Sequence, residues 1–492
     1  MELIWEEIEA VRLSCQTQAQ VRVSGEMPSP EGRTPLGVPA CTARLAIDKA
    51  EPGQDEVFLT GRILALVTAF DEEGRPFAYE STAGFEHTAE APGAQPGMTA
   101  EAEGYLQTLR VFPSGSGVMM EADAEVDIRV LSRSPMKVMG GVSGVNDLEM
   151  KRSPLSCTRK VKVGSDTLRL REEIAAEAVS EVISCEGLVT VRVVTPEQGE
   201  VCIGGVISVS AVVLETGGRV CQLVRQVPFR ERIASNAYTG ELSCRATLDS
   251  VYMHALGEEF GLLALEAEVS FELWSEIGCA CSVPADAFSP TIGFDALTEK
   301  TVFTSALGRL SRQTGMKETL LLPEDASDLK EPLFVSTHAV VTQTEIGRRE
   351  TTLRGVIATA VTYENVSGHI VTFSEDVPFE IQLENECGAN EVRAQARSVA
   401  CAAGYSERSI QVQYTLALNA ELERREALPV LVGLAEKEKE KEPGGIMIRF
   451  ASEGEEVFDV AKRYSAPCES VRRLNPDVKE PFSEGERLIM LV

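Results

Sequence analysis

Apolar and polar residues alternate along much of the chain, and β-branched residues are frequent, a pattern that predicts β-strands. Residues 206–214 are one such stretch. Because apolar side chains occur on both of its faces, we expect both faces to be covered. Gly217 and Gly218 follow and favour a tight hairpin turn. Residues 220–229 then predict an antiparallel return strand that ends near Pro228, which cannot donate to a central ladder.

The same arrangement occurs three times, and each copy is anchored on a glycine at position 61, 205 or 355. In every copy a turn glycine lies 13 residues after the anchor, namely Gly74, Gly218 and Gly368. A phenylalanine lies 24 residues after each anchor, namely Phe85, Phe229 and Phe379. Three copies with the same two spacings, offset by 144 and 150 residues, indicate an internal repeat.

Each copy also predicts a second hairpin, which in the middle copy is formed by residues 242–256 and 262–273. A further strand precedes each anchor, such as residues 182–194 in the middle copy. Four or more strands per copy are enough for an independent sheet, and packing such sheets on each other gives a β-sandwich-like domain. The predicted domains are residues 1–135, 155–285 and 298–430.

Residues 435–445 break the strand pattern with alternating Glu and Lys followed by Pro and Gly. They predict a charged linker, either a solvated spacer or a short helical extension. After it, the pattern predicts a strand, a helix with apolar residues at helical spacing from Val457 to Tyr464, a second helix beginning at Pro467 and a closing strand. Residues 446–492 are therefore expected to form a small α+β domain of strand–helix–helix–strand order.

Length and composition agree with several folded domains. A chain of 492 residues is too long to form a single hydrophobic core, and 43% hydrophobic residues are ordinary for a globular protein. The formal net charge of −29 argues against nucleic acid and anionic lipid as partners, because both attract clustered Lys and Arg. The acidic start Met1–Glu9 lacks the basic and apolar segments of a secretory signal. No apolar run approaches the roughly 20 residues that cross a bilayer, so we expect a cytosolic protein that does not span a membrane.

Candidate catalytic residues are sparse. A shared active site should place the same polar residue at the equivalent position of every copy. The four histidines do not recur in this way; they are His87, His254, His338 and His369. The twelve cysteines are too scattered for a disulfide scaffold, and most are predicted to be small buried residues. The close pair Cys279 and Cys281 predicts a structural role rather than a metal site. Carboxylates such as Glu266, Glu268 and Glu272 are predicted on solvent-facing positions, so we expect no enzyme activity, no metal and no cofactor.

Several short motifs recur with the repeat: the anchor glycine and its strand, the Gly-x turn, a strand ending in Val-Pro-Phe at 227–229 and 377–379, and a module boundary such as Ala94–Met98. This arrangement resembles the SPOCS domain, a module associated with spore-coat proteins of endospore-forming bacteria. The resemblance covers residues 10–425 and implies three tandem β-sandwich-like SPOCS-type domains. The first copy departs from the pattern with Ala83-Gly84-Phe85, and the third lacks the Pro-Gly-Met step.

The C-terminal residues contain the motifs Gly454–Val457, Val460–Tyr464, Leu474–Pro476 and Gly485–Ile489. Together these resemble the LysM module. The resemblance implies a groove between the loop before the first helix and the loop after the second, where family members hold N-acetylglucosamine chains largely through backbone groups. The binding residues implied in this way are Ser452, Gly454, Glu455, Glu456, Asn475, Pro476 and Asp477.

One departure concerns the expected ligand. Sugar-binding LysM modules usually have Gly-Asp-Thr or Gly-Asp-Ser where this chain has Gly454-Glu455-Glu456. A second carboxylate is expected to crowd a neutral sugar groove and make it acidic, which favours a protein partner on the same surface. The other interpretation is that Glu456 only caps the helix and that the module is a generic small fold.

Tandem SPOCS-like repeats followed by a LysM-like module are similar to the spore-coat morphogenetic proteins of the SipL and SpoVID type. The similarity implies a non-catalytic scaffold or adaptor in the mother-cell cytoplasm at the forespore surface. Its LysM-like module is expected to dock to the spore-coat morphogenetic ATPase of the SpoIVA type, and the chain to other coat proteins. The alternative is a protein that binds peptidoglycan or N-acetylglucosamine through that module. A third hypothesis, a wall-remodelling enzyme, lacks a plausible catalytic pair.

Overall fold

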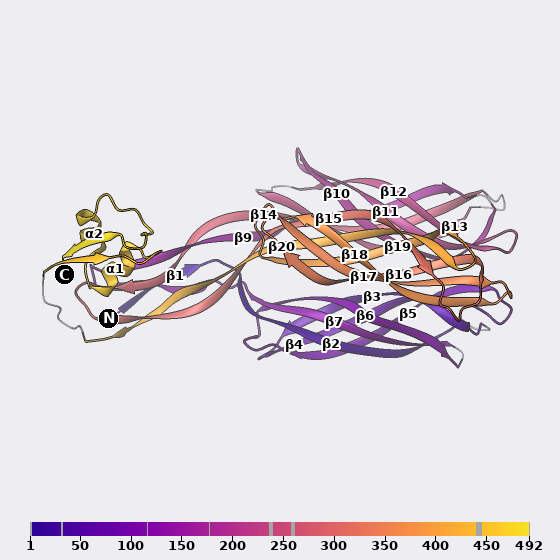
Figure 1. Cartoon of the computed structure of the whole chain (residues 1–492), viewed down its shortest axis with the longest axis horizontal. Helices are drawn as coiled ribbons and strands as arrows, with labels where there is room; N and C mark the ends of the chain where they lie inside the picture. Colours follow the sequence, from indigo (N-terminus) through magenta and orange to yellow (C-terminus); the bar gives the residue numbers. More distant parts are fainter. Residues whose placement is uncertain are drawn as a thin grey trace.

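The computed structural model describes residues 2–30, 33–115, 117–176, 178–235, 240–256, 261–438 and 445–491. These residues form a mainly β structure with two short helices, which confirms the predicted mainly β class. The molecule is elongated. A large β body occupies one end, a narrower stalk leads away from it, and the C-terminal module lies at the end of the stalk near the N-terminus (Figure 1).

Each of the three copies contains two three-stranded antiparallel sheets. The anchor sheet has the anchor glycine on its central strand, and the long-strand sheet packs against it. The anchor sheets are β3 (Leu36–Pro52), β4 (Glu56–Phe70) and β5 (Pro76–Glu90); β10 (Val179–Glu197), β11 (Glu200–Glu215) and β12 (Val220–Ala234); and β16 (Leu329–Ile346), β17 (Glu350–Asn365) and β18 (Ile370–Glu384). The long-strand sheets are β2 (Arg12–Pro28), β7 (Gly117–Ser132) and β6 (Thr99–Ser114); β9 (Glu149–Ala175), β14 (Leu262–Phe288) and β13 (Glu241–Ala255); and β15 (Phe294–Leu321), β20 (Ser409–Glu436) and β19 (Glu391–Tyr405).

The register of the anchor sheets accounts for the recurrent glycine and phenylalanine. In the middle copy Gly205 lies directly opposite Phe229 on the neighbouring strand, and the other two copies have the same pairing. A Cβ atom at position 205 would collide with the Phe229 ring and with the carbonyl oxygen of Thr190. The ring therefore lies over the glycine, and a spacing that looks arbitrary in the sequence is a cross-strand contact.

Each copy has its own apolar core between its two sheets. In the middle copy Ile207 and Val209 of β11 point into this core. The opposite face of β11 is also covered, because Val212 packs in an apolar cluster with Phe70 of the first copy and Phe334 of the third. The prediction that this strand is covered on both faces is confirmed, and neighbouring copies provide the second cover.

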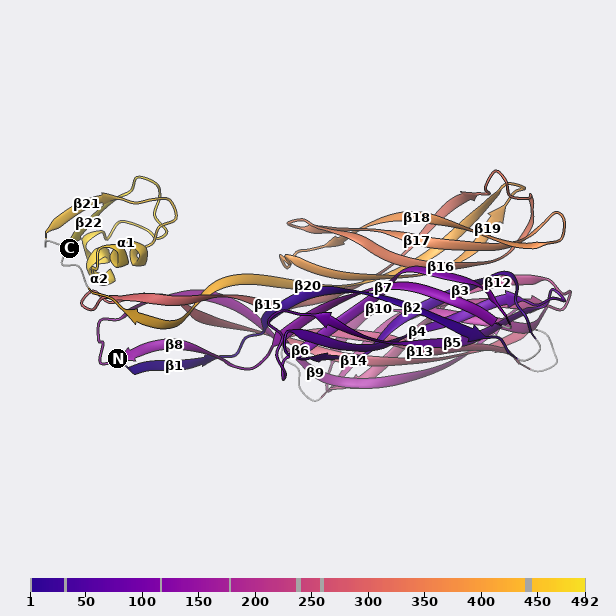
Figure 2. The same ribbon diagram turned by 90° about the horizontal axis from the view of Figure 1, so that it is seen from below.

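The copies follow one another along the chain but pack side by side (Figures 1 and 2). β2 of the first copy pairs with β15 of the third, so two long-strand sheets merge into one six-stranded sheet. The predicted module boundary at residues 94–98 is wrong: this segment is the turn between β5 and β6 inside the first copy, and Ala94 is fully buried in its core. The Pro and Gly residues there serve a turn.

The stalk is a bundle of three two-stranded ribbons, one from each copy. The first pairs β1 (Glu2–Ile8) with β8 (Met136–Ser143), and the others are the far ends of the β9–β14 and β15–β20 pairs. Apolar residues of all three ribbons, including Val138, Val283 and Val430, meet in a common core. The segments 136–154 and 286–297 between the predicted domains are therefore largely strands of this stalk, which extend the copies beyond the predicted bounds.

The C-terminal module consists of β21 (Ile446–Phe450), α1 (Val457–Arg463), α2 (Cys468–Leu474) and β22 (Arg487–Leu491), the predicted order of elements. Val457, Val460 and Ala461 of α1 are buried as their spacing predicts, and Pro467 immediately precedes α2. The predicted linker lies partly in β20, which continues to Glu436, and residues 439–444 lie outside the described residues. Among the described residues, no helix has the length and apolar character required to cross a membrane.

Candidate functional site

The seven predicted binding residues lie in the two loops beside the helices of the C-terminal module, and they differ in what they contact. Glu455 is 9% exposed. Its carboxylate forms ion pairs with Arg449 at 2.8 Å and Arg463 at 2.9 Å, and it accepts a hydrogen bond from the backbone N–H of Ser452 at 3.1 Å. Because its charge is compensated within the module, Glu455 shapes the loop instead of presenting a carboxylate to a ligand.

Asn475 also has a structural role. Its side-chain amide donates to the carbonyl oxygens of Val471 and Ile489, both at 2.7 Å, and its side-chain oxygen accepts the Ile489 N–H at 2.7 Å. These bonds tie the end of α2 to β22. The prediction of a ligand contact for this side chain is not supported by its geometry, since three of its hydrogen-bonding positions are already used.

Four of the predicted residues are exposed: Ser452, Gly454, Pro476 and Asp477. Gly454 has a φ of +79°, a conformation that favours glycine, and its N–H donates to the carbonyl oxygen of Phe482 at 2.9 Å. Glu480, which is not among the residues predicted from the sequence, accepts the Val457 N–H at 3.1 Å and pairs with Arg472 at 3.1 Å. The free surface of the predicted site is thus formed by the four exposed residues.

Glu456 differs from the other loop residues because it contacts the stalk. It is the N-cap residue of α1, and Asp459 accepts its backbone N–H at 3.0 Å. The Glu456 carboxylate pairs with Lys151 of β9 at 3.0 Å, and Lys151 also pairs with Asp459 at 3.1 Å. Burial disfavours the Lys151 ammonium, but the hydrogen bonds that it donates to the Glu456 and Asp459 carboxylates, together with their negative charges, outweigh burial and raise the pKa of Lys151.

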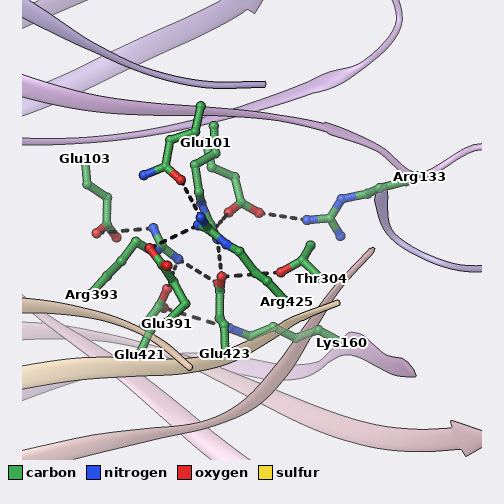
Figure 3. A network of polar contacts seen from close by, with 12 residues as sticks. Glu101, Glu103, Arg133, Lys160, Thr304, Glu391, Arg393, Glu421, Glu423 and Arg425 are labelled. Atoms are coloured by element: carbon green, nitrogen blue, oxygen red, sulfur yellow. Dashed lines mark hydrogen bonds and ion pairs between the residues drawn. The ribbon is translucent and has the colours of Figure 1, made fainter. Parts of the chain in front are cut away.

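A second polar cluster joins the copies (Figure 3). Arg129 of β7 is 3% exposed and bridges Glu101 of the first copy and Glu423 of the third. Arg393 pairs with Glu423 at 3.1 Å and with Glu103 of the first copy at 3.5 Å. Because both guanidinium groups are paired with carboxylates from two copies, the cluster provides a charged joint between copies.

Glu421 and Lys160 extend this joint to the middle copy. Lys160 of β9 lies 3.9 Å from Glu421, which also pairs with Arg309 at 2.7 Å. Burial acts to raise the pKa of Glu421, but Arg309 and Arg393 outweigh it and lower the pKa. The prediction that carboxylates occupy solvent-facing positions therefore fails for Glu421 and Glu423, because the outer face of β20 is covered by another copy.

A small cavity lies where the anchor sheets of the three copies meet. Thr42, Glu186 and Ser336 line it, one from each copy, and each lies 19 residues before its anchor glycine. Burial raises the pKa of Glu186 to about 7, and a hydrogen bond from Thr42 acts in the opposite direction. These residues are not among those predicted from the sequence, although their common distance from the anchor glycine is a signal that the sequence contains.

The cysteines are less buried than predicted. Cys157, Cys202, Cys244 and Cys468 are buried, while the other seven described cysteines are partly exposed, so the prediction that most are buried is wrong. Cys41, for example, lines the cavity between copies. Burial nevertheless raises the pKa of Cys41 to about 12, which leaves this thiol protonated and unreactive near neutral pH. Cys281 of the Cys279/Cys281 pair lies with its sulfur 3.7 Å from that of Cys157, and the Cys279 side chain lies outside the described residues.

The site was also compared with the requirements of a metal centre and with known proteins. Within the described ranges, no group of three or more His, Cys, Asp or Glu side chains is placed to hold a metal ion. No family model, no curated protein and no solved structure matches the chain.

Proposed function

We propose that this chain is a non-catalytic scaffold of spore-coat assembly, built from three SPOCS-type copies and a C-terminal LysM-like module. It acts in the mother-cell cytoplasm at the forespore surface. Its module docks to the coat basement-layer ATPase of the SpoIVA type, and the three-copy body contacts other coat proteins. The observation that carries the proposal is the position of the module, which lies at one end of an elongated molecule on a stalk to which all three copies contribute (Figure 2).

This shape suits an adaptor. The stalk has its own apolar core, and the buried joint around Arg129 holds the copies together, so the body can act as a spacer of defined length. A binding module at one end and a large surface at the other allow two layers to be connected. Several weak contacts on one chain gain avidity from their high effective concentration.

Capture of the purified SpoIVA-type ATPase by the full-length chain tests the proposal. Deleting residues 445–492 should abolish capture while circular dichroism shows that the β body remains folded. Because deletion also uncovers part of the stalk, Asp477→Arg in the exposed loop is the finer variant and should weaken capture at least several-fold. Glu484→Arg, the same charge change at another exposed position of the module, is the matched control. Capture that survives the deletion contradicts the proposal.

One observation favours the alternative of peptidoglycan or N-acetylglucosamine binding. The two carboxylates expected to make the groove acidic are compensated, Glu455 by Arg449 and Arg463 and Glu456 by Lys151. The loop surface is therefore less acidic, and more compatible with a neutral sugar, than its sequence suggests. Retention of the full-length chain on purified peptidoglycan, released by N-acetylglucosamine oligomers and weakened by Asp477→Arg, would establish this function instead.

A further inference from the structure

The C-terminal module is fastened to the stalk by an aromatic contact. Phe288, the last residue of β14, is 4% exposed and belongs to the same apolar cluster as Val460 and Val471 of the module. Its ring meets that of Phe458 of α1 edge to face, with ring centroids 5.2 Å apart. Aromatic pairs bury much apolar surface and favour this geometry, so this contact contributes apolar attraction between stalk and module.

Two groups of ion pairs flank the aromatic contact. Lys151 binds Glu456 and Asp459 on one side, and Lys462 binds Asp286 at 2.6 Å on the other. These side chains are about one third exposed, so each pair contributes little and is screened by salt. Their main effect is to orient α1 on the stalk, with the Glu456 end of the helix against β9.

The contact covers Glu456, one of the predicted binding residues, and the start of α2. Glu456 at the start of α1 is occupied by Lys151, and the N–H of Cys468 at the start of α2 donates to Glu149 at 3.2 Å. The module has an apolar core of its own besides Phe288, so it can leave the stalk and stay folded. The chain between Glu436 and Ile446 joins it to the body.

We propose that this contact is a latch, in which the stalk residues Glu149, Lys151, Asp286 and Phe288 mask the α1 face of the module until a partner protein displaces them. The inference rests on the proposed function, because it assumes a partner that uses the Glu456 end of α1. Only open molecules bind that partner, so the apparent affinity equals the affinity of the open form multiplied by the fraction of molecules that are open. Weakening the latch therefore strengthens binding without any new contact to the partner.

The test uses the full-length chain and two readouts. Asp286→Lys and Phe288→Ala weaken the latch from the stalk side, and Lys137→Glu is a control at an exposed position of β8. Hydrogen exchange of the 457–468 segment should become several-fold faster in both latch variants and, in the unmodified chain, at high salt. Affinity for the purified SpoIVA-type ATPase should rise by about tenfold, as opening a mostly closed population requires. Adding Lys462→Asp to Asp286→Lys restores the ion pair with its charges exchanged and should restore slow exchange.

The outcomes separate the latch from the proposed function. Exchange that is unchanged in Asp286→Lys and Phe288→Ala overturns the latch. Faster exchange with unchanged or weaker capture of the ATPase overturns the masking role, because the stalk then does not compete with the partner. If no variant captures the ATPase at all, the proposed function fails, and the exchange rates still decide whether the module opens.

Discussion

The cavity between the three copies contains a carboxyl group whose titration should be visible in the stability of the protein. Glu186 lines this cavity with Thr42 and Ser336, deep between the anchor sheets. Burial raises its pKa from an ordinary 4.5 to about 7, against the opposing hydrogen bond from Thr42. The thiols of Cys41 and Cys185, whose pKa values are raised to about 12 by burial and in part by Glu186, remain protonated in this range.

Whether stability rises or falls with pH follows from which state, folded or unfolded, holds the proton. Between pH 4.5 and about 7 the folded protein keeps Glu186 protonated while the unfolded chain has lost that proton, so stability falls as pH rises through this window. Above it the folded state bears a buried carboxylate. The difference between the two pKa values corresponds to roughly 3 kcal/mol, which we reduce to about 2 kcal/mol because residue Glu186 keeps some exposure to solvent.

Glu186→Gln replaces the protonated carboxyl with a neutral group of the same shape. It should stabilise the protein by about 2 kcal/mol near pH 8 and have little effect near pH 4.5. Urea denaturation at a series of pH values measures this, and the midpoint of the affected transition should move by about 1 M. Glu72→Gln makes the same change in an exposed turn and should alter the midpoint at neither pH. Parallel pH profiles for the native chain and Glu186→Gln would refute the reasoning.

Three further variants test contacts elsewhere in the molecule. Arg129→Met leaves Glu423 in the buried joint without this partner and should destabilise the packing of the copies by about 3–5 kcal/mol, seen as a lower urea midpoint. Gly205→Ala forces a Cβ into a phenylalanine ring and a carbonyl oxygen and should lower thermal stability by about 1–3 kcal/mol, whereas Gly217→Ala, which meets open space, should have a smaller effect. Asn475→Ala removes three hydrogen bonds inside the C-terminal module and should destabilise it by about 2–3 kcal/mol, measured by hydrogen exchange of β22. A module that exchanges at the native rate in Asn475→Ala would show that these bonds are dispensable.

The predicted binding residues illustrate the limit of reasoning from motifs. Glu455 and Asn475 were assigned to a ligand because they occupy the loops that contact sugars in LysM modules, yet they bind groups of the module itself. A motif records which residues occur together. It does not distinguish a side chain that contacts a ligand from one that holds the loop in shape, because both are polar and both lie near the site.

The sequence by itself determined the local structure. Alternating residues place the strands, glycines place the turns, and the repeated distance from Gly205 to Phe229 records a cross-strand contact that is the same in every copy. These features depend on neighbours in one hairpin, where backbone geometry sets the spacing. The helices of the C-terminal module follow in the same way from the period of residues such as Val457 and Val460.

Only the tertiary structure decided how these parts combine. The burial of Glu186 and Glu423 and the docking of Phe458 on Phe288 each join residues more than 100 positions apart in the sequence. The alternating pattern indicates which residues share a face of a strand, but it does not say whether solvent, another copy or the C-terminal module covers that face. That choice depends on the sum of many long-range contacts, and it converts strands expected to lie between domains into a stalk that holds the binding module.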